Sequence, residues 1–152
     1  MLSNVFRIIL VSSVIFAFFP SLSPAASERR TALVIGNGQY DVGRLKNPAN
    51  DATDMATALE HLGFAVILKR NAGQQEMEEA IRYFGQRLKR GGVGLFFYAG
   101  HGLQINGQNY LIPIGARIEK DTDAKYKAID AEMVLDEMAN AGNPINIVIL
   151  GA

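Results

Sequence analysis

Four short, almost entirely apolar runs constrain the fold of this chain more than any other feature. They are Thr31–Ile35, Phe64–Leu68, Val93–Tyr98 and Ile145–Leu150. Each run is apolar on both faces and too short for a buried helix, which is typical of strands inside a parallel sheet. Stretches with helical spacing separate the runs, so the sequence predicts an α/β fold with alternating strands and helices.

Three stretches between these runs predict helices. Asn47–Gly63, Gln74–Arg90 and Ile129–Ala141 each repeat apolar residues at helical spacing, and Asp130 is suited to cap the last of them. Right-handed crossovers favour a doubly wound, mostly parallel sheet with strand order 2-1-3-4 and helices on both faces. In such sheets, functional sites form beyond the carboxyl ends of the strands.

The segment that follows the third strand predicts a β-hairpin. Asn106 and Gly107 lie between two short β-like runs within Leu103–Pro113, and this dipeptide is the strongest short hairpin signal. The charged run that comes next, Ala116–Lys127, predicts a solvated loop.

The first 26 residues predict a secretory signal peptide. Met1–Arg7 carries one positive charge, Ile8–Phe19 is apolar apart from two serines, and small residues precede a cleavage position after Ala25 or Ala26. The apolar run is shorter than the ~20 residues that a membrane span needs, although a retained anchor is the alternative interpretation. We therefore expect an exported protein, periplasmic or secreted, with no stable membrane span after cleavage and a mature domain of residues 27–152.

Composition limits the chemistry that this chain can perform. The 152 residues contain no cysteine and two histidines, so they supply no disulfide, no thiol nucleophile and no credible zinc cluster. Fifteen basic residues balance fifteen acidic ones, so nothing favours nucleic acid as a partner. Gly36-Asn37-Gly38 suggests a phosphate cradle, but it lacks the third glycine of a dinucleotide site and the Lys-Ser/Thr pair of a P-loop. We expect no cofactor and no metal.

His101 is the residue whose position most indicates catalysis. It lies between two glycines, Gly100 and Gly102, just past the predicted strand Val93–Tyr98. Two interpretations are open: a turn histidine chosen for local hydrogen bonds, and a general base whose exposed ring reaches a reacting atom. If Ile145–Leu150 is the neighbouring strand, about 4.8 Å away, the residue after it faces His101 as a nucleophile faces its base.

Four stretches of this chain together resemble the large-subunit part of caspase-like cysteine peptidases, in the bacterial caspase-domain group related to metacaspases. They are RTALVIGNGQY, LKNPANDATDMATALEHLGF, LFFYAGHGLQINGQNYLIP and INIVIL, and the resemblance covers Arg30–Ala152. It implies a caspase-like fold and a cysteine-type endopeptidase acting on peptide or protein substrates. It also implies a truncated domain, because the last two strands of the family, its small-subunit part, are missing.

The resemblance further implies roles for individual residues. His101 matches the catalytic base, and Gly102 matches the residue whose backbone N–H helps to form the oxyanion hole. Asp51 matches an acidic residue of the first specificity pocket, which selects arginine or lysine. The nucleophilic cysteine is expected directly after Ala152, and Gly151 stands where the family usually has aspartate.

These assignments leave several functional interpretations open. Asp51 is also explained as a negative charge near a helix N-terminus. Because His101 has no thiol to activate, we expect this chain alone to be inactive as an endopeptidase. The alternatives are a pseudoenzyme or interaction module that binds peptides in the same cleft, and a non-functional gene fragment. An unpaired edge along Ile145–Leu150 would favour self-association, or pairing with a chain that supplies the missing strands.

Overall fold

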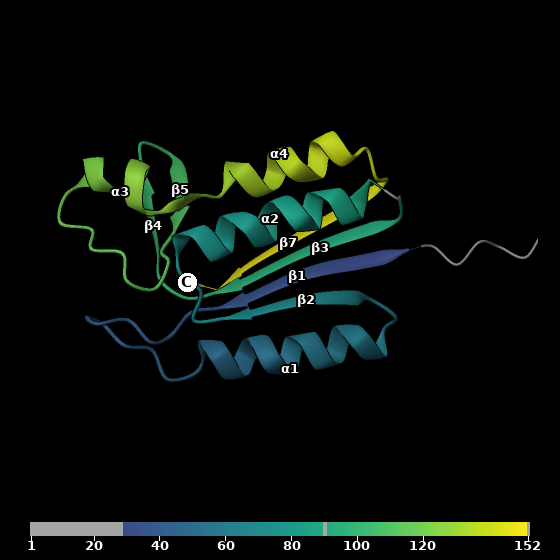
Figure 1. Ribbon diagram of the computed structural model, residues 1–152, viewed down its shortest axis with the longest axis horizontal. Coiled ribbons are helices and arrows are strands. Elements are labelled where there is room, and N and C mark those ends of the chain that lie inside the picture. Colours follow the sequence, from purple (N-terminus) through teal and green to yellow (C-terminus); the bar gives the residue numbers. More distant parts are fainter. Residues whose placement is uncertain (1–28, 90, 152) are drawn as a thin grey trace, which may run out of the picture.

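A computed structural model describes residues 29–89 and 91–151, so the predicted signal peptide, residues 1–26, lies outside the described residues. The elements, in chain order, are β1 (Arg30–Gly36), α1 (Pro48–His61), β2 (Ala65–Arg70), α2 (Gln74–Leu88), β3 (Val93–Ala99), β4 (Gly102–Ile105), β5 (Gln108–Leu111), α3 (Asp121–Lys127), β6 (Ile129–Asp130), α4 (Glu132–Ala141) and β7 (Ile145–Gly151) (Figure 1). Within this described part, no helix combines the length and apolar character that a membrane crossing requires.

The main sheet is parallel and has the strand order β2-β1-β3-β7. Strand β7 contains the fourth predicted run, Ile145–Leu150, so the predicted order 2-1-3-4 is confirmed. Helix α1 covers one face, and α2 covers the other with α4 packed beside it (Figure 1). Because all four strands run in the same direction, their carboxyl ends lie at one edge of the sheet. There Ala99 pairs with Gly36 on one side and with Gly151 on the other.

The apolar character of both sheet faces comes from two separate cores. Alternate residues of a strand point to opposite faces, so each central strand contributes to both cores. Leu33, Ile35, Phe96 and Tyr98 pack with residues of α2 and α4, whereas Ala32, Val34, Leu95 and Phe97 pack with residues of α1. Burial on both faces explains why the sequence shows continuous apolar runs instead of alternation.

The predicted hairpin is confirmed. Strands β4 and β5 pair antiparallel with Leu103 opposite Tyr110, and the two turn residues Asn106 and Gly107 have φ values of 50° and 85°. Two positive φ values in a two-residue loop are what a type I′ turn requires, which is why Asn-Gly predicted it correctly.

Two local predictions were wrong. Ile129 and Asp130 do not begin a helix; they form β6 and pair with Leu111 and Tyr110, so α4 starts only at Glu132. Asp130 still satisfies the first turn, because its carboxylate accepts a hydrogen bond from the Glu132 N–H at 3.0 Å. The charged run predicted as a loop contains the helix α3. Within α3, Lys127 forms an ion pair with Asp123, four residues earlier, at 3.3 Å.

Strand β7 lies at the edge of the main sheet. It pairs with β3 on one side, and no strand of the described residues pairs with its other side. All seven of its residues are exposed, and Ile147, Val148 and Ile149 retain 39%, 40% and 38% of their accessible surface. Aliphatic side chains with this exposure on a sheet edge form a surface suited to pairing with another chain.

Candidate active site

The loops at the carboxyl edge of the sheet are fastened together by Asn37, which is fully buried. Its backbone N–H donates to the Ala99 carbonyl at 2.8 Å, and its side-chain oxygen accepts from the Ala72 N–H at 2.9 Å. The side-chain amide donates to the carbonyls of Ala72 and Ile112 at 3.2 and 3.3 Å. Because these groups belong to three chain segments, the Gly-Asn-Gly stretch has a structural explanation that needs no bound phosphate.

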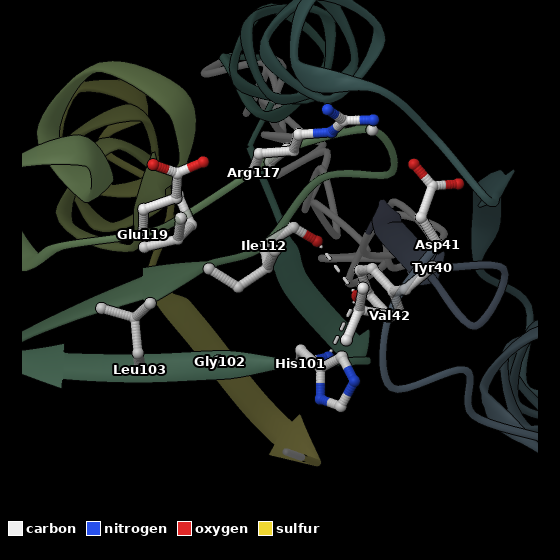
Figure 2. Close-up of a pocket in the computed structure, with 12 residues that line it drawn as sticks. Tyr40, Asp41, Val42, His101, Gly102, Leu103, Ile112, Arg117 and Glu119 are labelled. Atoms are coloured by element: carbon white, nitrogen blue, oxygen red, sulfur yellow. Dashed lines mark hydrogen bonds between the residues drawn. The ribbon is translucent and has the colours of Figure 1, made fainter.

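The main chain of His101 is held on both sides by tyrosine hydroxyls, and Figure 2 shows the Tyr40 side. The His101 N–H donates to the Tyr40 hydroxyl at 3.0 Å, and that hydroxyl donates to the Ile112 carbonyl at 3.0 Å. On the other side, the Tyr98 hydroxyl donates to the His101 carbonyl at 2.7 Å. Both phenols are buried, so the position of the histidine backbone is fixed by hydrogen bonds sheltered from water.

Gly100 is required by this arrangement. A Cβ atom at residue 100 would lie 2.6 Å from the Tyr98 hydroxyl oxygen and 2.8 Å from that of Tyr40. These separations are shorter than van der Waals contact, so any side chain there would displace one of the phenols. The glycine that precedes His101 therefore makes room for the two tyrosines.

The imidazole of His101 is oriented by the loop between β1 and α1. Its Nε2 atom lies 2.5 Å from the carbonyl oxygen of Gly43, and its ring centroid lies 4.5 Å from that of Tyr40. Because a carbonyl can only accept, the hydrogen bond assigns the proton to Nε2 and leaves the lone pair of the neutral ring on Nδ1. Gly43 has a φ of 71°, and a Cβ there would come 3.0 Å from Nε2. With its proton on Nε2, the neutral imidazole of His101 can accept a second proton at Nδ1.

The end of β7 reaches the residues beside His101. The Gly100 N–H donates to the Gly151 carbonyl at 3.1 Å, and Leu150 lines a hollow of about 230 Å³ together with Gly102. Ala152 itself lies outside the described residues. The last described residue of β7, Gly151, is therefore hydrogen-bonded to the residue that precedes His101.

The structure brings together two of the three residues to which the sequence assigned site roles. Gly102 follows His101 directly, begins β4, and lines with it a cavity of about 550 Å³. Asp51 lies in the first turn of α1, is exposed, and does not line that cavity. Its carboxylate is at the same edge of the sheet, and its place in the first turn also fits the helix-dipole interpretation.

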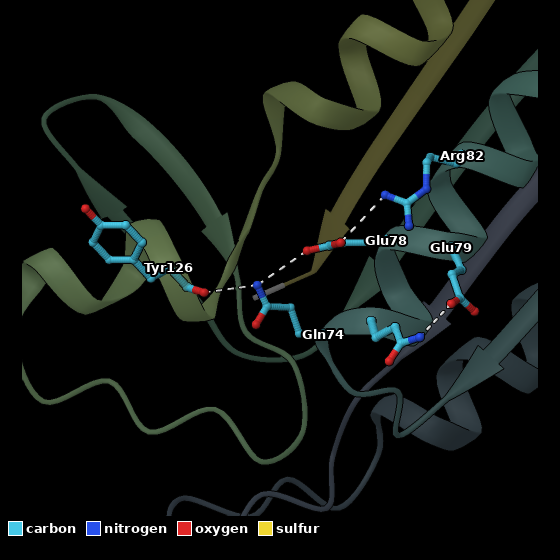
Figure 3. Close-up of polar contacts among 6 residues, drawn as sticks. Gln74, Glu78, Glu79, Arg82 and Tyr126 are labelled. Carbon is cyan, nitrogen blue, oxygen red and sulfur yellow. Dashed lines mark hydrogen bonds and ion pairs between the residues drawn. The ribbon is translucent and has the colours of Figure 1, made fainter.

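The wall of the cavity opposite His101 is the segment between Gly115 and Glu119. Lys127 donates to the Arg117 carbonyl at 2.8 Å, and the Gln74 side-chain amide donates to the Tyr126 carbonyl at 3.1 Å (Figure 3). These bonds tie the wall to α3, and α3 to the start of α2. In residues 29–89 and 91–151, no group of three histidine, cysteine, aspartate or glutamate side chains is placed to hold a metal ion.

Three residues that position the histidine, Tyr40, Gly43 and Tyr98, were not identified by sequence reasoning. Tyr98 is the last residue of a predicted strand and reads as core, and Tyr40 and Gly43 lie in a loop without regular spacing. The only signal was their closeness in sequence to the ends of the first and third strands. Their contacts with His101 join residues 61, 58 and 3 positions apart.

A parallel α/β sheet with strand order β2-β1-β3-β7 and an oriented histidine at the carboxyl end of a central strand fits a caspase-like fold. The chain belongs to the caspase domain family (Peptidase C14), whose family model matches residues 29–152.

Two curated relatives carry the name mucosa-associated lymphoid tissue lymphoma translocation protein 1, one from Homo sapiens and its homolog from Mus musculus. Each is 34% identical over 94 residues, which are 61% of this chain and 11% of the relative. The matched region therefore spans about a tenth of the length of these relatives.

Two solved structures share the fold. The Drosophila initiator caspase Dronc has a TM-score of 0.56 at 10% identity, over 99% of this chain and 63% of the other. A protein from Geobacter sulfurreducens has a TM-score of 0.55 at 19% identity, over 82% of this chain and 52% of the other. At these identities, the similarity establishes the fold alone.

The tyrosine pair predicts a loss of stability at alkaline pH. Burial raises the pKa of both Tyr98 and Tyr40 above the ordinary value of 10.0. The folded state therefore binds the phenolic protons more tightly than the unfolded state, and this contribution is complete below pH 10 and is lost as the pH rises above it. The free energy of unfolding should fall by up to about 1.4 kcal/mol per pH unit for each tyrosine.

Urea unfolding between about pH 9 and about pH 11 measures this effect. Tyr98→Phe should reduce the alkaline slope, whereas Tyr126→Phe, at a position that is 72% exposed, should keep the slope of the parent chain. Equal slopes for the two variants would contradict the assignment to the buried pair.

Proposed function

We propose that this domain supplies the histidine, the oxyanion donor and the peptide cleft of a caspase-type cysteine endopeptidase. The proposal rests on the orientation of the His101 ring. His101 follows the central strand β3, and its Nε2 atom is hydrogen-bonded to the Gly43 carbonyl. A base oriented by a third group, beside the end of a neighbouring strand, is the arrangement that activates a nucleophile. Family membership supports a thiol as that nucleophile.

The proposed reaction uses each group in turn. His101 Nδ1 accepts the thiol proton, and the thiolate attacks the scissile carbonyl while the Gly102 N–H stabilises the negative oxygen. The imidazolium then donates its proton to the departing amine, which leaves a thioester that water hydrolyses. The thiol belongs directly after Ala152. Because the 152 residues contain no cysteine, a polypeptide of these residues is expected to be inactive.

Asp51 is the proposed selector of a basic side chain before the scissile bond. Its exposed carboxylate lies in the first turn of α1, at the edge of the sheet where His101 lies. An arginine or lysine of the substrate would form a charge-assisted hydrogen bond with it. We also propose that the domain works after export, because the N-terminal residues have the composition of a secretory leader.

Turnover assays with Arg- and Lys-terminated peptide reporters test the peptidase proposal. The 152-residue chain should show no turnover and no reaction with thiol-directed inhibitors. A natural polypeptide that contains these residues and a cysteine after β7 should cleave the reporters and lose activity on alkylation. Turnover by the 152-residue chain, or turnover by the longer one that alkylation leaves unchanged, would overturn the proposal.

A second candidate function is peptide binding without cleavage. The cavity of about 550 Å³ beside His101 favours it, because a cleft of that size takes a peptide side chain whether or not a thiol is present. A chain that binds the reporters reversibly and never cleaves them in any natural polypeptide would be such an interaction module.

For a polypeptide of these 152 residues, we further propose self-association through β7. Its exposed aliphatic residues and unpaired backbone edge would be covered by the β7 edge of a second copy, or by another chain that adds a strand. Ile149→Lys should weaken association at least about tenfold, because a charged side chain opposes edge pairing.

Sedimentation velocity over a range of concentrations measures this change. The matched control is Leu135→Lys on α4, because Leu135 is 41% exposed and Ile149 is 38% exposed. A monomer in which the amide hydrogens of Ile145–Leu150 are fully protected would show that the edge is already covered, contrary to this proposal.

A further inference from the structure

Two hollows adjoin the segment formed by His101 and Gly102. The smaller one, about 230 Å³, is bounded by Gly102 and by Leu150 near the end of β7. The larger one, about 550 Å³, is bounded by both His101 and Gly102 but by no residue of β7. In Figure 2, the end of β7 lies below the imidazole, whereas Asp41, Arg117 and Glu119 lie above it. His101 therefore lines the larger cavity, whereas the end of β7 lines the smaller hollow.

The chemistry of amide cleavage indicates that the two hollows receive different groups. A nucleophile that follows β7 attacks the scissile carbonyl from the side of the smaller hollow. The imidazole must reach the nitrogen that departs, so the chain on the amine side of the scissile bond continues past His101. We propose that the larger cavity is the subsite for the leaving segment, the residues that follow the scissile bond. This inference rests on the proposed peptidase function.

The lining of the larger cavity favours an aliphatic or aromatic side chain in that segment. Val42, Leu103, Ile112 and Ile118 contribute aliphatic side chains, and the charged residues Asp41, Arg117 and Glu119 are exposed. Val42 is 88% exposed beside the imidazole, so its side chain is free to be covered by a bound ligand. Its burial by an apolar side chain would contribute to affinity in proportion to the area removed from water.

The carboxylate of Asp41 also favours a ligand from the amine side of the scissile bond. Cleavage creates a free amino group on the leaving segment, and a carboxylate in the lining attracts that positive charge. The expected ligand is therefore a peptide with a free amino terminus and a large apolar first side chain. A peptide with an acidic first residue places a negative charge near two carboxylates and one guanidinium, so it should bind more weakly.

Methyl NMR of the 152-residue chain tests this subsite without any requirement for catalysis. The probes are three tetrapeptide amides that have a free amino terminus and differ only in a first residue of leucine, glycine or aspartate. The leucine peptide should shift the methyl signals of Val42 and Ile118 and bind at least about tenfold more tightly than the other two. Val42→Ser should weaken its binding at least about threefold, whereas Leu135→Ser on α4 should not.

Two outcomes would overturn the subsite. One is equal binding of the three peptides; the other is a leucine peptide that shifts the methyl signals of Leu111 and Leu150, which line the smaller hollow. Because binding needs no thiol, the two proposals fail separately. A thiol-bearing natural polypeptide that cleaves no reporter would overturn the peptidase, whereas these NMR outcomes would overturn the assignment of the cavity to the leaving segment.

Discussion

Replacing His101 with alanine is expected to lower kcat/KM by at least about 10³-fold in a natural polypeptide that carries a thiol after β7. The variant removes both the acceptor of the thiol proton and the donor to the departing amine. The ring's hydrogen bond to the Gly43 carbonyl is lost, but the bonds to Tyr40 and Tyr98 stay in place, because they involve the backbone of His101. Reporter hydrolysis as a function of substrate concentration measures the loss.

The chain offers a matched control in its other histidine. His61 is exposed in the last turn of α1 and lines none of the cavities beside His101. His61→Ala should therefore change kcat/KM by less than about twofold, since exposed substitutions away from a site have small effects. If both variants lost the same activity, or if neither did, His101 would not be the base and another residue would have to be sought.

Much of the fold follows from the sequence for a specific physical reason. Runs such as Val93–Tyr98 are apolar at every position, which requires a sheet covered on both faces, and the handedness of crossovers then leaves few strand orders. The errors occur where a distant partner decides the local structure. Ile129 and Asp130 have neighbours that favour a helix, yet they pair with β5, and nothing in the local pattern contains that information.

For the site, too, the sequence identified the residue with a local signal and missed those whose role depends on distant contacts. The sequence identified His101 because a strand end followed by glycines indicates an exposed functional edge. It did not identify Tyr40 or Gly43, because their role depends on the path of the β1–α1 loop and on contacts with a residue about sixty positions away. It also did not explain Gly100, which is required by the two phenols that lie against it.

Gly36 connects the fold to the site, and its replacement with alanine is expected to have the largest effect on stability. Helix α1 begins directly against the end of β1, so a Cβ at residue 36 would lie 2.1 Å from the Pro48 carbonyl oxygen and 2.6 Å from the Ala52 Cβ. Pro48 O belongs to the backbone, which cannot turn away as a flexible side chain can. The whole first turn of α1 would have to move.

Such a shift would separate α1 from the core that Ala52, Ala56 and Leu59 form with the sheet. It would also displace the β1–α1 loop, which carries the carbonyl that orients His101. Gly36→Ala should therefore cost at least about 4 kcal/mol of unfolding free energy, a large part of the total for a domain of this size. Urea unfolding followed by circular dichroism measures the difference.

Gly63→Ala is the control that separates overlap from backbone conformation. Gly63 has a φ of 80°, which an L-residue adopts only with strain, but nothing lies within 4 Å of the position that a Cβ would take. This variant should lose only about 1–2 kcal/mol, the cost of a left-handed conformation. Gly36 carries the opposite combination, an ordinary strand conformation with no room. If the two substitutions had equal effects, the close approach of α1 to β1 would not be what requires glycine at residue 36.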